Sequence, residues 1–109
     1  RLSKSHINSM LKKYNARRKV IVPRLNEMGL STPVPKGAFY AFSDISHLSN
    51  DSRKFSFDLL SRMKVAVVPG VDFGKRGEGH IRLSFAAKLP IIERALDRIE
   101  KFVKSYDRR

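Results

Sequence analysis

Apolar residues near the start of the chain recur at alternating spacings of four and three, the period of one face of an α-helix. The series, which includes one charged position, is Ile7, Leu11, Tyr14, Arg18, Ile21, Leu25 and Met28. Gly29 follows, and glycine commonly ends a helix because it adopts the left-handed conformation freely. The pattern predicts a long helix over about 4–28, with a kink or break near Val22 because Pro23 has no amide hydrogen.

Three short segments have strand patterns. Residues 38–42 are mainly aromatic, and residues 64–68 are rich in valine. In residues 80–85 apolar and polar positions alternate, which predicts two faces: Ile81, Leu83 and Phe85 on one, and His80, Arg82 and Ser84 on the other. These segments predict a small three-stranded sheet.

Two further segments have helical patterns. Asp51 or Ser52 can cap a helix whose apolar face is Phe55, Leu59, Leu60 and Met63. Pro90 suits the first turn of the last helix. The apolar stripe of that helix is Ile92, Ala95, Leu96, Ile99, Val103 and Tyr106. The order helix-strand-helix-strand-strand-helix predicts one α+β domain over residues 1–109, with helices packed on the sheet.

Composition and charge narrow the function classes. The chain of 109 residues contains no cysteine, which excludes a disulfide scaffold and fits a reducing, cytoplasmic setting. The net charge is +13, and residues 1–36 hold nine Lys and Arg against one acid. The excess is compatible with binding to nucleic acid or to an acidic protein surface. A solvated helical face is the favoured interpretation, because no nucleic-acid-binding motif accompanies the basic residues. No apolar run is long enough to cross a membrane. Because the chain opens without Met inside a predicted helix, we expect it to belong to a longer protein.

Few residues stand out as candidates for chemistry. His6, His47 and His80 are too far apart, and lack the acidic partners in ligand spacing, to suggest a metal site. The glycine-rich segment 70–79 matches no phosphate-binding motif and lies between two strands. Arg82 lies within a strand, and arginine is costly to bury unless it meets an anion. From spacing alone, Arg82 is either a surface residue or an anion-binding group.

Five segments, in this order, resemble the C-terminal part of class I/II aminotransferases, which depend on pyridoxal 5'-phosphate. They are Tyr14-x-x-Arg17-Arg18, Leu25-x-x-x-Gly29, Pro35-Lys36-Gly37-Ala38-Phe39-Tyr40, Val65-Ala66-Val67-Val68-Pro69-Gly70-x-x-Phe73-Gly74 and Gly77-Glu78-Gly79-His80-Ile81-Arg82-Leu83-Ser84-Phe85-Ala86. The chain is most similar to prokaryotic aspartate- and aromatic-type aminotransferases. The resemblance identifies residues 1–109 as the small C-terminal domain of this family, in which 1–28 is the helix leading in from a large domain.

The resemblance also implies roles for individual residues. Arg82 would pair with the α-carboxylate of the substrate, and Phe39 would line the substrate side of the site. Gly70, Phe73 and Gly74 would form a mainly structural loop near the site. The Schiff-base lysine and the residues that hold the cofactor belong to the large domain of the family. We therefore expect no catalytic, cofactor-binding or metal-binding residue in this chain.

For the full-length parent, the resemblance implies a cytoplasmic, homodimeric transaminase of amino acid metabolism. It would move an amino group from an L-amino acid to a 2-oxo acid, and this domain would close the site over the substrate. The chain alone would be inactive and would bind no cofactor. Three alternatives stay open: a lyase or synthase of the same fold, an aminotransferase-like domain of a transcription regulator, and a basic nucleic-acid-binding module. The sequence does not identify the amino acid or the 2-oxo acid.

Overall fold

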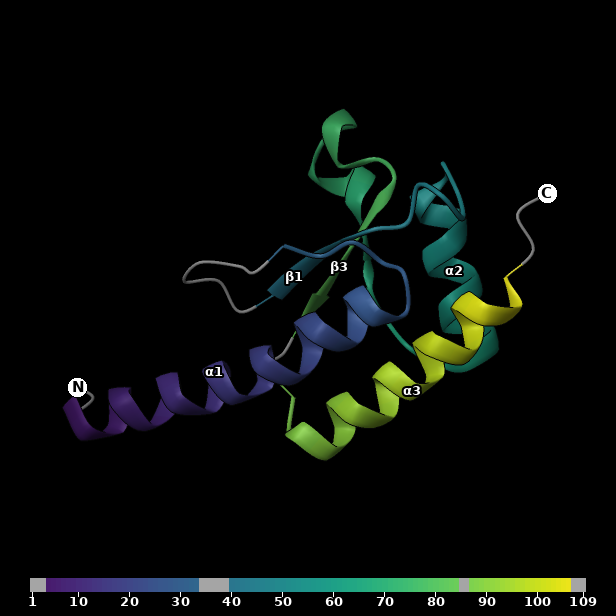
Figure 1. The fold of residues 1–109 in the computed structure, drawn as a ribbon. Helices are drawn as coiled ribbons and strands as arrows, with labels where there is room; N and C mark the ends of the chain where they lie inside the picture. The colour runs from purple at the N-terminus through teal and green to yellow at the C-terminus, as the bar shows by residue number, and fades with distance from the viewer. Residues whose placement is uncertain (1–3, 34–39, 85–86, 107–109) are drawn as a thin grey trace.

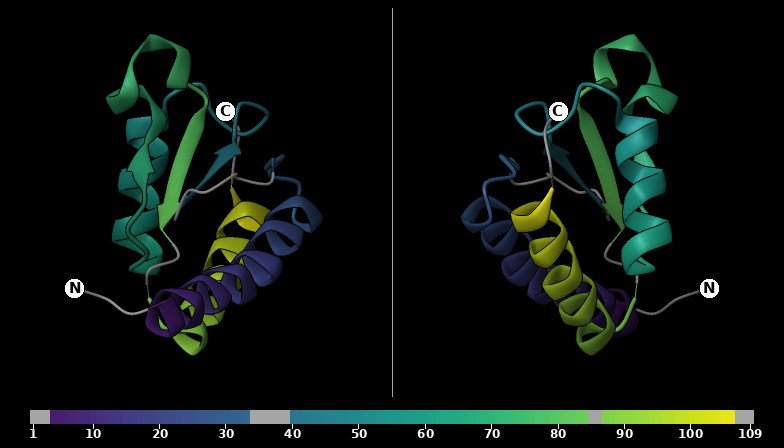
Figure 2. Two further views of the ribbon diagram at one scale, coloured as in Figure 1. Left: turned by 90° about the vertical axis from the view of Figure 1, so that its left-hand side faces the viewer. Right: turned by 90° about the vertical axis from the view of Figure 1, so that its right-hand side faces the viewer.

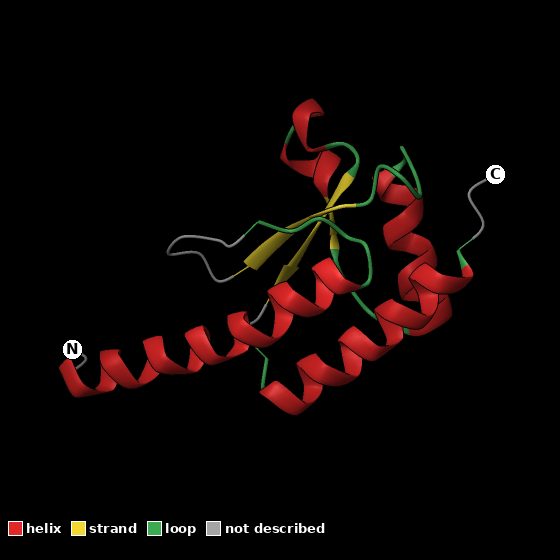
Figure 3. Cartoon of the chain, viewed as in Figure 1, coloured by secondary structure: helices red, strands yellow, loops and turns green. Residues whose placement is uncertain are grey.

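The computed structural model describes residues 4–33, 40–84 and 87–106 (Figure 1). It confirms a small α+β fold with three α-helices and a three-stranded sheet in the described part of the chain (Figure 3). The elements are α1 (Lys4–Glu27), β1 (Tyr40–Asp44), α2 (Ser52–Met63), β2 (Val68–Pro69), the 3-10 turns η1 (Gly70–Phe73) and η2 (Lys75–Gly77), β3 (His80–Ser84) and α3 (Leu89–Ser105).

The sheet is antiparallel, and β3 lies in its centre with β1 and β2 on either side. Its alternation agrees with the sequence pattern, because Ile81 is 0% exposed and Leu83 8% exposed, whereas Arg82 between them is half-buried. Phe85, predicted on the same face, lies outside the described residues. The sheet therefore has an apolar face directed to the core and a second face that carries Arg82.

The core lies between the apolar face of the sheet and all three helices. α1 and α3 lie side by side (Figures 1 and 2), and the Arg24 Nη2 atom lies 2.9 Å from the Asp97 Oδ1 atom across them. The core residues are Ile21, Leu25, Leu30, Ala41, Ile45, Phe55, Leu59, Val65, Ile81, Leu83, Ile92, Leu96, Ile99 and Phe102. Lys12, Lys13 and Lys19 of α1 are exposed, as expected for a solvated basic face.

Two predicted helix faces differ from the observed ones. On α3 the sequence pattern selected Val103 and Tyr106, which are only partly buried, and missed Phe102, which is 0% exposed. The reason is that α3 packs against both α1 and α2, so it buries a wider face than one stripe. On α2 the predicted Leu60 is 49% exposed, and Ser56 is buried in addition to Phe55 and Leu59.

The ends of the helices follow their local chemistry. Gly29 ends α1 with φ +94°, and the Leu30 amide donates to the Leu25 carbonyl at 2.9 Å, which is the Schellman pattern. Of the kink or break predicted near Val22, the break is wrong, because α1 is continuous through Pro23. Ile21 and Leu25 flank the proline, and their burial in the core holds the helix despite the lost hydrogen bond.

The strand predicted at 64–68 is also largely wrong. Lys64 instead ends α2 in the left-handed conformation, and Val65 enters the core as part of a loop. Only Val68 and Pro69 pair with β3. β1 extends to Asp44, beyond the end of the predicted 38–42, whose first two positions lie outside the described residues. The second strand is short because the chain comes to it from the end of α2 through the core.

Candidate functional site

The sheet face opposite the core, which we call the open face, carries several aromatic rings around one arginine. Phe42 on β1 is paired directly with Arg82 on β3, and Tyr40 lies two residues away on the same face. The Arg82 Cζ atom is 4.6 Å from the centre of the Tyr40 ring and 4.5 Å from the centre of the Phe73 ring. We call Tyr40, Phe42 and Phe73 the aromatic cluster.

The three rings also contact one another. Phe42 meets Phe73 edge-to-face at 5.5 Å between ring centres, and it meets Tyr40 at 6.3 Å with an angle of 79°. Edge-to-face contacts of this kind are favourable because the positive edge of one ring meets the negative face of the other. The aromatic cluster is therefore a connected set that spans β1 and the turn after β2.

Arg82 has no acidic partner in the described part of the chain. None of the ion pairs or hydrogen bonds found among these residues involves its guanidinium group. Cation–π contacts stabilise the charge without consuming its N–H donors. A half-buried guanidinium with available donors is suited to bind an anion, and its planar fork matches the two oxygens of a carboxylate.

The turns η1 and η2 place Phe73 over the sheet, and Figure 1 shows them projecting at the end of the sheet away from α1 and α3. A Cβ atom on Gly70 would collide with the carbonyl oxygen of Gly77, and one on Gly77 would collide with the carbonyl oxygen of Gly70. The two turns therefore pack backbone against backbone. Gly74, between them, has φ +115°, a conformation that other residues rarely adopt.

The same turns are tied to the first turn of α2. The Ser52 amide donates to the Glu78 Oε1 atom at 2.6 Å, and the Gly79 amide donates to it at 3.1 Å. The Val71 amide donates to the Ser52 hydroxyl at 3.2 Å. Burial raises the pKa of Glu78, but the hydrogen bonds from Ser52 and Gly79 outweigh it and hold this pKa below its ordinary value. Glu78 is therefore a charged anchor for the turns.

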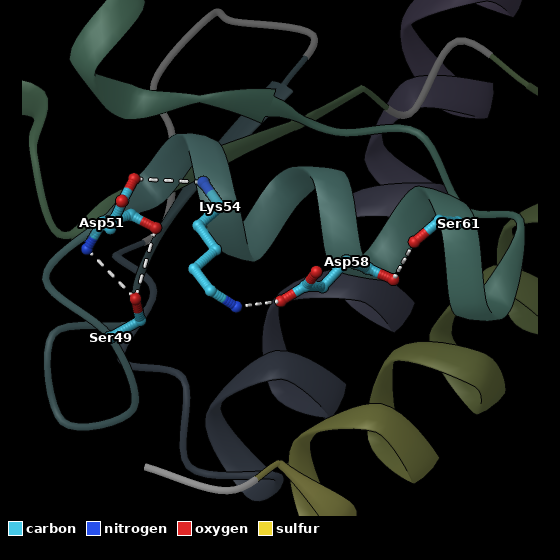
Figure 4. A network of polar contacts seen from close by, with 5 residues as sticks. All are labelled: Ser49, Asp51, Lys54, Asp58 and Ser61. Atoms are coloured by element: carbon cyan, nitrogen blue, oxygen red, sulfur yellow. Dashed lines mark hydrogen bonds and ion pairs between the residues drawn. The ribbon is translucent and has the colours of Figure 1, made fainter. Parts of the chain in front are cut away.

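A second polar network on α2 is structural. Asp51 caps the helix, because its Oδ1 atom accepts from the Lys54 amide at 3.1 Å, which settles the choice between Asp51 and Ser52 (Figure 4). Lys54 then reaches Asp58 on the next turn with 2.8 Å between Nζ and Oδ2. These contacts stabilise the first turns of α2, the helix to which η1 and η2 are hydrogen-bonded.

The structure brings together most of the predicted site residues. Arg82 and Phe73 are in contact, and Gly70 and Gly74 shape the turn that carries Phe73. Phe39 lies outside the described residues. Tyr40 was not predicted from the sequence as a partner of Arg82. The alternation along β1 places Tyr40 and Phe42 on one face of the strand. The contact of Tyr40 with Arg82 follows only when the register of β1 with β3 is known.

Neither a group of metal-binding side chains nor a membrane-spanning helix is found among the described residues. No three His, Asp or Glu side chains come together in the way a metal ion requires among these residues. None of the helices in the described part combines the length and the apolar character needed to span a membrane.

The chain belongs to the aminotransferase class I and II family, whose family model matches residues 1–99. It is 49% identical over 98 residues to an aspartate aminotransferase of Pyrococcus abyssi, a match that covers 90% of this chain and 25% of that protein. It is 45% identical over 98 residues to aromatic-amino-acid aminotransferase 2 of Thermococcus litoralis, with the same two coverages.

Solved structures show the same relationship. The aromatic aminotransferase of Pyrococcus horikoshii superposes with a TM-score of 0.87 at 48% identity, over 90% of this chain and 26% of that one. The alanine aminotransferase of Pyrococcus furiosus gives a TM-score of 0.87 at 40% identity, over 92% of this chain and 26% of that one. The chain therefore spans about a quarter of the length of these relatives.

Members of this family use pyridoxal phosphate, and no described lysine of this chain fits the covalent attachment of that cofactor. Every lysine whose side chain is described is exposed, so none lies in an enclosed pocket that would shield a bond to the cofactor from water. The half-buried cation of the open face, Arg82, is instead suited to a small carboxylate.

Proposed function

We propose that this chain is the small domain of an aminotransferase that moves an amino group from an L-amino acid to a 2-oxo acid. Arg82 is the residue of this domain that binds the α-carboxylate of both substrates. The observation that carries the proposal is a half-buried guanidinium with no acidic partner among the described residues, set against the aromatic cluster on the open face. The names of the relatives support a transaminase over a lyase or synthase.

The chemistry of the site is one of binding and orientation. The guanidinium donates two parallel hydrogen bonds to the carboxylate, and this fork fixes the direction of the neighbouring bonds at Cα. The rings around Arg82 reduce the access of water and so strengthen the charge pair. Pyridoxal phosphate, bound by the rest of the parent, supplies the electron sink.

Several further properties belong to the same proposal. Phe39 lines the substrate side of the site. The domain moves to close the site over the bound substrate, and the parent is a cytoplasmic homodimer. The chain alone does not catalyse the reaction, because the lysine that bonds to the cofactor is supplied by the large domain.

The test is the substitution Arg82→Lys in the full-length parent. Removing one partner of a charged hydrogen-bonded pair costs about 2–5 kcal/mol, so kcat/KM for the amino acid should fall by roughly 1.5 to 3.7 powers of ten. The fall should be much smaller for the amine that lacks the carboxylate. Arg76→Lys is the matched control, because Arg76 is an exposed arginine of the adjacent turn. Equal losses toward the amino acid and the amine would show that Arg82 does not bind the carboxylate.

A further inference from the structure

We infer that Phe73 and Tyr40 are positioning residues for Arg82, which hold its guanidinium ready for a carboxylate by cation–π contact instead of by an ion pair. The inference rests on the proposed function and deepens it, because it assigns a role to two residues that touch the arginine. Phe73 then acts on substrate binding, beyond a purely structural role in its turn.

The guanidinium group of Arg82 can be held in place either by a carboxylate or by an aromatic ring. A carboxylate partner would fix Arg82, but it would also occupy the N–H donors and the charge that a substrate needs. An aromatic ring holds the cation through its negative face and leaves those donors available. The Arg82 Cζ atom lies 4.5 Å from the Phe73 ring centre and 4.6 Å from that of Tyr40, within the range of such contacts.

The second step is that the nearby acids are engaged elsewhere. Asp72, next to Phe73 in sequence, pairs with Arg53 of α2 at 3.2 Å between Oδ1 and Nη2. Glu78 accepts two amide hydrogens at the start of α2 and the end of the turns. Asp44, at the end of β1, accepts from the Ser46 hydroxyl at 2.6 Å and from the Ser46 amide at 2.8 Å. The acids closest in sequence to the cluster therefore do not compete for Arg82.

The third step is that the Phe73 ring is held in place by the fold. Gly70 and Gly77 allow the two turns to pack backbone against backbone, and the Val71 amide is bound to the Ser52 hydroxyl. Phe42, paired opposite Arg82, contacts the Phe73 ring edge-to-face. Although the Phe73 side chain is 48% exposed, its position is thus fixed from both sides.

The consequence is a preorganised carboxylate site. An arginine side chain has many rotamers, and freezing them when the substrate arrives reduces affinity. The two rings restrict the guanidinium before the substrate binds. Loss of one ring should therefore weaken the binding of carboxylates and leave amines without a carboxylate unaffected.

The experiment uses Phe73→Leu in the full-length parent, with Phe57→Leu as the matched control. Phe57 is 69% exposed on α2 and is absent from the cation–π contacts of Arg82. We expect Phe73→Leu to raise KM for the amino acid, and the inhibition constant of 3-phenylpropionate as a carboxylate probe, by about 3- to 30-fold. The control should change neither by more than about twofold, and the melting temperatures should show that both variants fold.

A rescue and a double substitution separate positioning from a general structural effect. Phe73→Tyr keeps the ring and should keep the wild-type affinity for 3-phenylpropionate. In an Arg82→Lys background, Phe73→Leu should have little further effect, because the group that it positions has already been replaced. Tyr40→Leu should behave like Phe73→Leu, and Tyr40→Phe like the wild type.

The outcomes distinguish this inference from the function on which it rests. A carboxylate-specific loss with Arg82→Lys but not with Phe73→Leu would overturn the positioning role and leave the proposed function intact. Equal losses of Phe73→Leu toward the amino acid and the amine would also overturn it. If Arg82→Lys lowers activity toward the amino acid and toward the amine equally, the proposed role of Arg82 is wrong, and the positioning role is wrong with it.

Discussion

Phe102 gives the sharpest test of how α3 is oriented in the core. Its ring is 0% exposed and lies 5.2 Å from the Phe55 ring in an edge-to-face contact and 5.2 Å from the Tyr106 ring. Each aromatic contact contributes about 0.5–1.5 kcal/mol beyond the area that it buries. Phe102→Leu keeps most of the apolar volume and removes both contacts, so it should lower the free energy of unfolding by about 1–3 kcal/mol. The milder substitution is preferable, because Phe102→Ala would cost about 3–5 kcal/mol.

That loss is large for a chain of this size. A stability of 0.05–0.15 kcal/mol per residue gives roughly 5–16 kcal/mol for 109 residues. Urea unfolding followed by circular dichroism measures the difference between the variant and the wild type. Phe57→Leu, at an exposed position, should change the free energy by less than about 0.5 kcal/mol.

The neighbouring Val103 provides the decisive comparison. Val103 is only partly buried, so Val103→Ala should cost about 1 kcal/mol at most. The sequence pattern alone placed Val103 in the buried stripe and left Phe102 out. If Val103→Ala destabilises the chain more than Phe102→Leu does, the orientation of α3 described above is wrong.

Two further predictions concern Glu78 and the cofactor. The pKa of Glu78 lies below its ordinary value of 4.5 in the folded state, because the hydrogen bonds from Ser52 and Gly79 outweigh its burial. Its charge therefore stabilises the fold above the unfolded pKa, and this stabilisation is lost as the pH falls through the folded pKa. The wild type should melt at a higher temperature than Glu78→Gln at about pH 7, and a difference in melting temperature that does not shrink as the pH falls below 4.5 would refute this. Pyridoxal phosphate added to this chain and trapped with borohydride should give scattered, substoichiometric lysine adducts by mass spectrometry, because every lysine whose side chain is described is exposed; one stoichiometric adduct at a single lysine would contradict the assignment of the cofactor to the rest of the parent.

Local features of the structure could be predicted from the sequence because they depend on residues that are neighbours along the chain. The cap at Asp51 and the glycine at the end of α1 act within one helical turn. The alternation in β3 likewise requires only the two-residue period of a strand, and it placed Arg82 opposite the apolar face. The motifs along the chain, taken together and in their order, were enough to identify the family by resemblance.

Other features depend on contacts between distant segments, which no local pattern contains. Residues 64–67 have a strong strand composition, yet the chain leaves α2 there and Val65 is drawn into the core. Pro23 would break an isolated helix, but Ile21 and Leu25 are fixed on either side of it by packing. In both cases tertiary burial outweighs local preference.

The sequence by itself determined the order of the elements, the face of β3 on which Arg82 lies and the family. Only the tertiary structure decided what holds Arg82. The register of β1 with β3 brings Tyr40 to the arginine, and the packing of Gly70 against Gly77 brings Phe73 to it. Tyr40 is far from Arg82 in sequence, and Phe73, although near it in sequence, reaches it only through the packed turns. Both contacts follow from pairing and packing, which are set by the whole fold.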